Sequence, residues 1–297
     1  MRFHSDLKFA RFLPRAIFTP STFRLVRWLF SQSRKRKPGD WQRIDLPNGQ
    51  YLLVVGSKDP SCPVLMWLHG GGLVLGTPEQ EVGFCSDIAK RANVTVVIPS
   101  YRLAPEHPYP SALNDLGVAY HWIAEQPWCD PDQLAIGGNS AGGGLAAGLL
   151  LTLQKASIRP CALILHQPML DADTCSRPDP DPKSIRIWSA ATNRFSWNAY
   201  LNGLSSPVPS AASPAKASDA ELSEFPPTWL SIGTSDLFFD ETAKLADRLS
   251  VLGKAPRFYR IEGAFHGFES IAPNAGITQK FMGDLSQWIS NICDTKT

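Results

Sequence analysis

Apolar positions recur along this chain with two different periods, which predict strands and helices in turn. Short runs rich in Val, Ile and Leu predict buried strands at 51–55, 64–68, 94–98, 133–137, 161–166, 228–232 and 256–261. Apolar residues spaced three or four apart predict helices at 79–91, 113–123 with Ser111 as N-cap, 141–155, 241–252 and 281–292. This alternation predicts an α/β fold, in which helices cover both faces of a mostly parallel central sheet.

The alternation stops between residues 170 and 227. This segment is rich in Pro, Ser, Ala and Asp, and it separates two predicted core strands. Helical patterning returns only in fragments near 185–201. Long insertions in compact domains usually have a function, and a lid over an active site is a common one. We therefore expect a helical cap here.

Composition allows one large domain with a smaller lid, since 43% of the 297 residues are hydrophobic. The net charge of +2 hides an asymmetry. Residues 1–37, the N-terminal arm, carry ten Lys or Arg and one Asp, a charge of +9 that leaves −7 on the rest. Aromatic and basic residues mix over 23–30, and the cluster Arg34 to Lys37 follows. This pattern is typical of a lid with a solvated basic face, or of a helix on an anionic membrane surface.

Other classes are not indicated. The basic arm lacks a recognised nucleic-acid-binding module, so we expect no nucleic acid partner. The first thirty residues lack the apolar core of a secretory signal, and no apolar run reaches eighteen residues. The six cysteines are dispersed, without the paired spacing of a zinc site or a disulfide framework. We therefore expect a cytoplasmic protein with reduced thiols.

The segment Gly138 to Gly142, with sequence GNSAG, lies between a predicted strand and a predicted helix. Glycines on both sides of a serine permit the sharp turn that lifts a nucleophile clear of a sheet edge. Ser140 is therefore the candidate nucleophile. About seventy residues earlier, another predicted strand ends in His69 to Gly72, and amides of such a glycine run can face a developing oxyanion.

A serine hydroxyl needs a neighbouring base, and the chain order Ser, acid, His leaves His166 and His266 as candidates. His166 has no acid-bearing strand end before it, whereas His266 follows the predicted strand 256–261, so we favour His266. Asp236 follows the strand 228–232 and is our candidate for the carboxylate that orients the imidazole. Asp240 is the alternative, but it falls where a helix begins and is better explained as its cap.

Together these motifs resemble the hormone-sensitive-lipase-like carboxylesterases of the α/β-hydrolase fold. The matching residues are His69 to Gly72, Tyr101 to Glu106 with Pro108, Pro110 and Asp115, Gly138 to Gly142, Asp236 to Glu241, and His266 to Phe268. The resemblance spans roughly residues 60 to 290. It implies a catalytic domain of residues 46–169 and 228–297, under a cap built from residues 1–45 and the insertion 170–227.

The resemblance also implies roles for the loop residues. The backbone N–H groups of Gly71, Gly72 and Ala141 would form the oxyanion hole. His69 and Gly70 would shape that loop. At position 139, members commonly have an acidic residue where this chain has Asn139. Asn139 removes a charge beside the nucleophile and leaves the three catalytic candidates in place.

The implied activity is hydrolysis of small carboxylic esters, with short acyl chains as the family-level expectation. It would run through a Ser-His-Asp triad and an acyl-enzyme, without a metal or an organic cofactor. An amidase or arylformamidase could use the same residues, and the basic arm leaves a membrane-surface lipase open. This family also includes ligand-binding receptors that have lost the base, and the presence of His266 argues against that class. A homodimer is compatible with the sequence.

Overall fold

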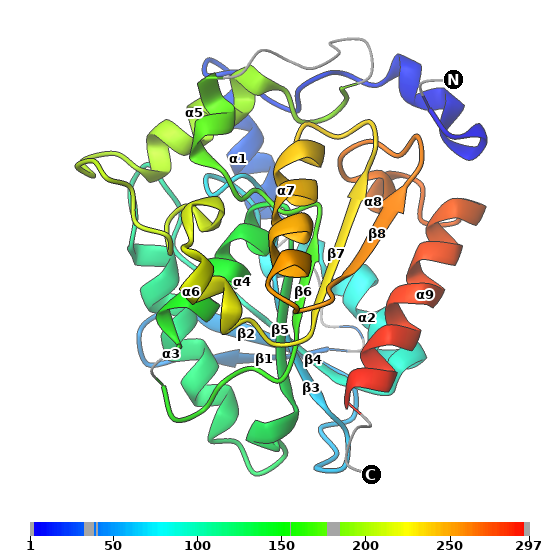
Figure 1. Cartoon of the computed structure of the whole chain (residues 1–297). Helices are drawn as coiled ribbons and strands as arrows, with labels where there is room; N and C mark the ends of the chain where they lie inside the picture. Colours follow the sequence, from blue (N-terminus) through cyan, green and yellow to red (C-terminus); the bar gives the residue numbers. More distant parts are fainter. Residues whose placement is uncertain (1–2, 33–38, 40, 155, 177–184, 294–297) are drawn as a thin grey trace.

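A computed structural model describes residues 3–32, 39, 41–154, 156–176 and 185–293 (Figure 1). Eight strands in this part of the chain form one sheet, in the order β1-β2-β4-β3-β5-β6-β7-β8. They are β1 Trp41–Asp45, β2 Tyr51–Val55, β3 Val64–Leu68, β4 Thr95–Pro99, β5 Leu134–Asn139, β6 Leu163–His166, β7 Thr228–Gly233 and β8 Arg257–Ile261. β2 pairs antiparallel with β1 and with β4, and every other pair is parallel. The predicted α/β architecture is confirmed.

All seven predicted strands are present, with ends that shift by a few residues, but β1 was not predicted. Its residues alternate irregularly between half-buried and exposed, because β1 is an edge strand with polar side chains such as Gln42 and Arg43. The sequence-based boundary at residue 45 is therefore corrected. Residues 41–45 pair with β2 and belong to the sheet.

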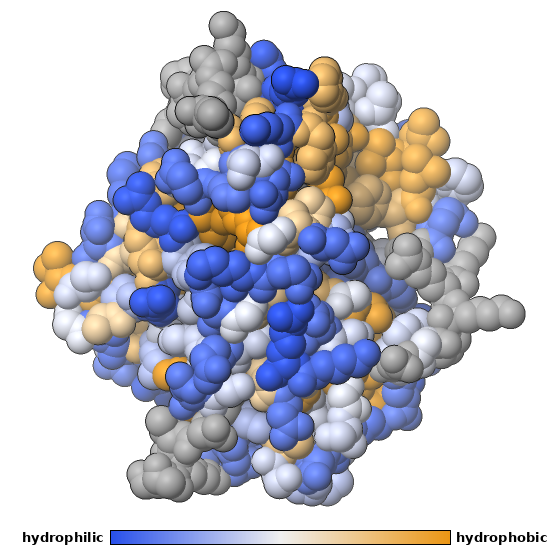
Figure 2. All heavy atoms as spheres, turned by 90° about the vertical axis from the view of Figure 1, so that its right-hand side faces the viewer, coloured by the Kyte–Doolittle hydropathy of each residue, from blue (hydrophilic) through white to orange (hydrophobic). Residues whose placement is uncertain are grey.

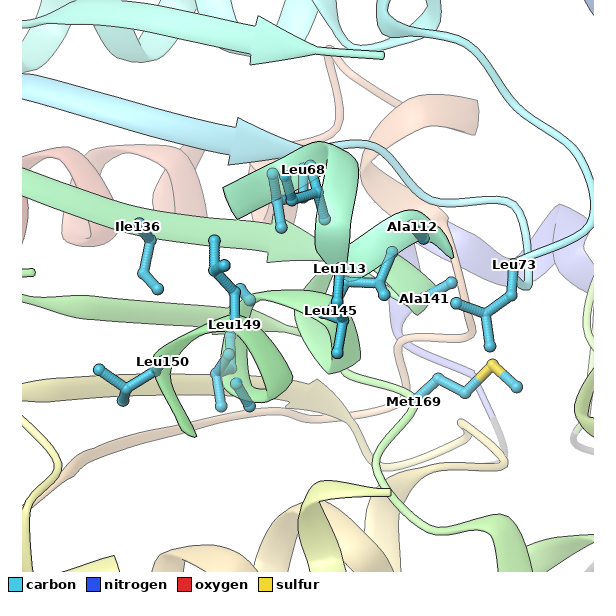
Figure 3. Close-up of a cluster of buried hydrophobic side chains, with 14 of the residues drawn as sticks. Leu68, Leu73, Ala112, Leu113, Ile136, Ala141, Leu145, Leu149, Leu150 and Met169 are labelled. Atoms are coloured by element: carbon cyan, nitrogen blue, oxygen red, sulfur yellow. The ribbon is translucent and has the colours of Figure 1, made fainter. Parts of the chain in front are cut away.

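Helices cover both faces of the sheet, as predicted. Their bounds are α2 Val82–Ala92, α3 Ser111–Ala124, α4 Ala141–Thr152, α7 Phe239–Val251, α8 Phe268–Ile271 and α9 Gly276–Cys293. β3 shows the two-sided packing, because Met66 and Leu68 join the core beside α3, α4 and α7, whereas Leu65 and Trp67 join the core beside α2 and α9. Figure 3 shows leucines of α4 packed in the first of these cores.

Two predicted helix caps are wrong. Ser111 is the first residue of α3, and the N-cap is Pro110, without a side-chain hydrogen bond. Asp240 lies in the first turn of α7, whose N-cap is Phe238. An acidic side chain in a first turn still interacts favourably with the helix dipole. Asp240 therefore has a residue type that suits the start of a helix, but it lies within the first turn and not at the N-cap.

The cap segments lie at the end of the sheet toward which the strands β7 and β8 point (Figure 1), and this is called the cap end. Its helical segments are η1 Ser5–Phe12, α1 Phe23–Ser31, η5 Ala172–Ser176 and α5 Ala190–Tyr200, and the insertion continues through η6 Pro214–Lys216 and α6 Asp219–Ser223. The arm and the insertion contact each other, because the ring of Phe18 packs against those of Trp188 and Phe195. The backbone of Ile187 also hydrogen-bonds to Pro14 and Ile17.

The first part of the arm packs on the body instead. Leu7 and Ala10 are fully buried beside Phe265 and Phe281, and the His4 N–H donates to the carbonyl of Gly263. The basic cluster Arg34 to Lys37 lies outside the described residues. No helix in the described ranges combines the length and the apolar character that crossing a bilayer requires.

Candidate active site

Ser140 lies in the tight turn between β5 and α4, with φ 57° and ψ −119°. A non-glycine residue rarely adopts a positive φ, and here three backbone hydrogen bonds hold it: the Ser140 N–H donates to the His166 carbonyl, and the Ser140 carbonyl accepts from the N–H groups of Gly144 and Met169. Close approach at Gly142 completes the turn, because a Cβ there would lie 2.0 Å from the Leu68 carbonyl oxygen. The turn around Ser140 therefore requires small residues beside the serine, as the pattern of a strand, a serine and a helix predicted.

Three side chains that are distant in sequence meet at this turn. The His266 Nε2 atom lies 2.9 Å from Ser140 Oγ, and its Nδ1 atom lies 2.8 Å from Asp236 Oδ2. A carboxylate can only accept, so Nδ1–H donates to Asp236, which leaves the Nε2 lone pair for the serine hydroxyl. The second oxygen, Oδ1 of Asp236, accepts from the Phe238 N–H at 2.9 Å. The structure thus brings together the three catalytic candidates.

All three side chains are buried, with exposed fractions of 4% for Ser140, 3% for Asp236 and 6% for His266. Burial lowers the pKa of His266, but the Asp236 carboxylate and, to a smaller extent, the Glu269 carboxylate together raise it by more, so the pKa lies above its ordinary value. The neutral imidazole can accept a proton, and the imidazolium that results is stabilised by Asp236.

The alternatives are not at this site. His166 hydrogen-bonds to Ser231 Oγ at 2.9 Å, and only its backbone carbonyl reaches Ser140. Asp240 is exposed on α7.

The glycine loop after β3 faces the same turn. Gly71 and Gly72 have φ values of 121° and 61°, which favour glycine. Within the described residues, no group accepts a hydrogen bond from the N–H of either glycine. Ala141 is the first residue of α4, so its N–H has no partner inside the helix. In the described part of the chain, none of the three predicted donors therefore has a hydrogen-bond acceptor from the protein.

The comparisons with known proteins agree with this geometry. The family model for the α/β-hydrolase fold matches residues 65–270, which is more than half of the chain. The chain belongs to the α/β-hydrolase family. Its resemblance to the hormone-sensitive-lipase-like carboxylesterases is thereby confirmed, together with the predicted fold.

The relatives of this α/β hydrolase include named esterases. Esterase LipI of Mycobacterium tuberculosis is 30% identical over 232 residues, which are 72% of this chain and 69% of LipI. Ethyl acetate hydrolase of Pseudomonas putida is 31% identical over 210 residues, 69% of this chain and 65% of that protein. The solved structure of a bacterial heroin esterase has a TM-score of 0.86 at 27% identity, and the match covers 99% of both chains.

The residues predicted to shape the loop of this α/β hydrolase do so by packing. The His69 ring stacks on Tyr101 at 4.1 Å between centroids, and Tyr101 Oη donates to the His69 carbonyl at 2.7 Å. A Cβ on Gly70 would lie 3.2 Å from the Asn139 carbonyl oxygen, a tight contact that a larger residue could make only if this backbone shifted slightly. The side chain of Asn139 points elsewhere, and its Nδ2 donates to Glu269 Oε1 at 3.3 Å.

Sequence reasoning missed two residues beside the site. The ring of Trp188, from the cap insertion, lies 6.2 Å from that of His266 and covers Gly72. Trp188 lies in the insertion 170–227, where helical patterning occurs only in fragments, so no sequence signal placed it beside His266. Glu269 follows His266 by three residues, and the missing acid at position 139 is the signal that could have drawn attention to it.

The described residues contain no group of three or more His, Cys, Asp or Glu side chains arranged to hold a metal ion.

Proposed function

We propose that this protein is a serine carboxylesterase that hydrolyses small esters through Ser140, His266 and Asp236. The hydrogen-bonded series from Ser140 to His266 to Asp236 is the observation that supports this most strongly. The esterase names of LipI and of the heroin esterase agree with it.

In the proposed mechanism, His266 Nε2 takes the hydroxyl proton as Ser140 Oγ attacks the ester carbonyl carbon. The carbonyl π electrons move to oxygen, and the N–H groups of Gly71, Gly72 and Ala141 stabilise that oxyanion. The oxyanion collapses, the bond to the alkoxy group breaks, and the protonated His266 gives its proton to the leaving alcohol. A water molecule then repeats the steps on the acyl-enzyme and releases the acid.

A short acyl group suits the proposal best. Trp188 and Phe238 both pack near the imidazole, with ring centroids 6.2 Å and 5.3 Å from that of His266, which limits the room beside it. The relative from Pseudomonas putida is named for ethyl acetate, a two-carbon acyl ester.

The test is a series of p-nitrophenyl esters from acetate to dodecanoate, with the wild type and Ser140→Ala. We expect kcat/KM to be highest at two to four carbons, with hydrolysis by Ser140→Ala at the uncatalysed background. Matched p-nitroanilides test the amidase alternative, which would be preferred if anilides reacted at rates comparable to esters. No ester hydrolysis above background in the wild type would contradict the proposal.

The second candidate is a lipase acting at an anionic lipid surface, and the exposed apolar residues of the arm favour it. Of the eight large hydrophobic side chains exposed in the described part of the chain, five lie within the arm: Phe9, Phe12, Leu25, Trp28 and Leu29. Figure 2 shows the face of the molecule on which the N-terminal segment lies, and apolar side chains gather near the upper end of this face. Apolar side chains beside a charge of +9 match an interfacial segment on anionic lipid.

Deleting the arm would not test this cleanly, because Leu7, Phe18 and Phe23 are buried in the cores. The better variant is the triple substitution Leu25→Ser, Trp28→Ser and Leu29→Ser, with Val251→Ser as an exposed control on α7. We expect the triple variant to lose co-sedimentation with phosphatidylglycerol vesicles while its p-nitrophenyl acetate hydrolysis is unchanged. Equal vesicle binding by the triple variant and the control would remove this candidate.

A further inference from the structure

Glu269 is a buried carboxylate beside the site that the proposed mechanism does not use. It lies in α8, three residues after His266, and its exposed fraction is only 4%. Its Oε1 atom accepts from Asn139 Nδ2 at 3.3 Å, and its Oε2 atom accepts from Gln167 Nε2 at 2.8 Å. The imidazole of His166 faces the same oxygen, with its Nε2 atom 3.3 Å away.

These contacts connect Glu269 to both members of the reacting pair. Asn139 is the residue before Ser140. Gln167 uses its other amide atom, Oε1, to accept from the backbone N–H of Gly267 at 2.8 Å, and Gly267 is the residue after His266. One carboxylate thus holds the chain beside the nucleophile and the chain beside the base.

The charge of Glu269 also acts on His266. The carboxylates of Asp236 and, to a smaller extent, Glu269 raise the pKa of that imidazole above its ordinary value, against the lowering caused by burial. Burial raises the pKa of Glu269 itself, but His166, a backbone hydrogen bond and, to a smaller extent, His266 together lower it by more, which favours the ionised form. Glu81, just before α2, is a further buried acid, close enough for the Glu269 charge to raise its pKa, and it does not contribute to the pKa shift of His266.

We propose that Glu269 is a positioning residue for the Ser140–His266 pair, and that it supplies a negative charge from the base side in a chain that has the neutral Asn139 before the nucleophile. The carboxylate orients the side chains of Asn139 and Gln167, and these residues position the backbone next to Ser140 and next to His266. This inference rests on the proposed serine-hydrolase chemistry, and it explains how this chain functions with Asn139.

The first test is Glu269→Gln, which keeps the shape, removes the charge and replaces one acceptor oxygen by a donor. We expect the plateau kcat to fall by roughly tenfold or more, since small misplacements of reacting groups are costly. The acid limb of the pH profile should move to lower pH, because the imidazole loses one charge that raises its pKa. KM should stay within about twofold, since the Glu269 side chain is buried and its contacts are with protein groups. Glu262→Gln, which removes an exposed charge in the loop between β8 and α8, is the matched control and should change neither kcat nor the acid limb.

The second test reverses the polarity of the Asn139–Glu269 hydrogen bond. In the double variant Asn139→Asp, Glu269→Gln, the new carboxylate can accept from the new amide, whose oxygen can still accept from Gln167. We expect the double variant to recover most of the kcat lost by Glu269→Gln. Asn139→Asp alone places two carboxylates together in a buried site and should be slower than the double variant.

The rate of phosphorylation of Ser140 by diisopropyl fluorophosphate provides a readout that needs no natural substrate. Its pH dependence should shift with Glu269→Gln as the ester profile does. A wild type that is phosphorylated by this reagent but hydrolyses no ester would refute the proposed esterase function and leave this inference testable. An unchanged acid limb and kcat in a folded Glu269→Gln variant would overturn the inference, as would a double variant no faster than Glu269→Gln. Thermal melting of every variant checks folding.

Discussion

Two helices of this protein, α4 and α1, place apolar side chains in opposite surroundings. In α4, every residue from Ala141 to Leu150 is buried. In α1, only Phe23 is buried, and Leu25, Trp28 and Leu29 are each more than half exposed. Leucines therefore occur in two settings. In α4 they fill the core under the nucleophile, and in α1 they form part of an exposed apolar surface.

The small residues of α4 show why the first use is demanding. A Cβ on Gly142 would lie 2.0 Å from the Leu68 carbonyl oxygen, and one on Gly144 would lie 2.1 Å from the Met169 carbonyl oxygen. The helix backbone touches the neighbouring strand ends directly, so its position determines where Ser140 lies. Nothing comparable constrains the outer face of α1.

The largest difference should appear at the start of α4. We expect Ser140→Ala to lower kcat for p-nitrophenyl acetate by roughly a millionfold, because loss of the nucleophile removes the whole triad pathway. Ser111→Ala, at the start of α3, is the matched control and should retain wild-type activity. A Ser140→Ala variant within tenfold of the wild type would contradict the assignment.

The next largest effect should come from Gly142→Ala. The added methyl has no space beside Leu68, so we expect a loss of activity of about a hundredfold or more, since the nucleophile is displaced. Gly117→Ala in α3 meets nothing within 4 Å and should raise stability by about 0.5–1 kcal/mol, the usual gain of alanine over glycine in a helix. Melting temperature and esterase activity are measured for both variants. Equal activity and stability of Gly142→Ala and Gly117→Ala would refute the argument that Gly142 approaches Leu68 too closely for a side chain.

The smallest expected effects come from a matched pair of leucines, one buried in α4 and one exposed in α1, which compares burial most directly. Leu145→Ala in α4 should lower the free energy of unfolding by about 2–5 kcal/mol, because it opens a cavity in the core. Leu29→Ala in α1 should change it by less than about 0.5 kcal/mol, because that side chain is already in contact with solvent. Urea unfolding checks both values. A large cost for Leu29→Ala would mean that the outer face of α1 is covered in solution.

The sequence identified three residues whose side chains meet in the structure, because motif spacing and chain order are local signals. Ser140, Asp236 and His266 each follow a strand whose apolar run is easy to recognise, and parallel strands bring their carboxyl ends to one edge. The glycines of the oxyanion loop were predicted for the same reason. The roles of these residues stay proposals, since geometry alone does not measure catalysis.

What the sequence could not predict depends on contacts between distant segments. β1 escaped prediction because an edge strand with polar residues has no apolar run. Trp188 reaches the site only through the packing of the cap, and Glu269 gains its contacts from β5 and the loop after β6. The division into cap and catalytic domain, the cytoplasmic location and a homodimer stay predictions.

The most direct measurement of the central claim is the site of covalent attachment of diisopropyl fluorophosphate, found by peptide mass spectrometry. If His266 makes Ser140 nucleophilic, the wild type gains one diisopropylphosphoryl group on the peptide that contains Ser140, with loss of fluoride, and His266→Ala gains it far more slowly. A modification at another residue, or equal rates for the wild type and His266→Ala, would contradict the account.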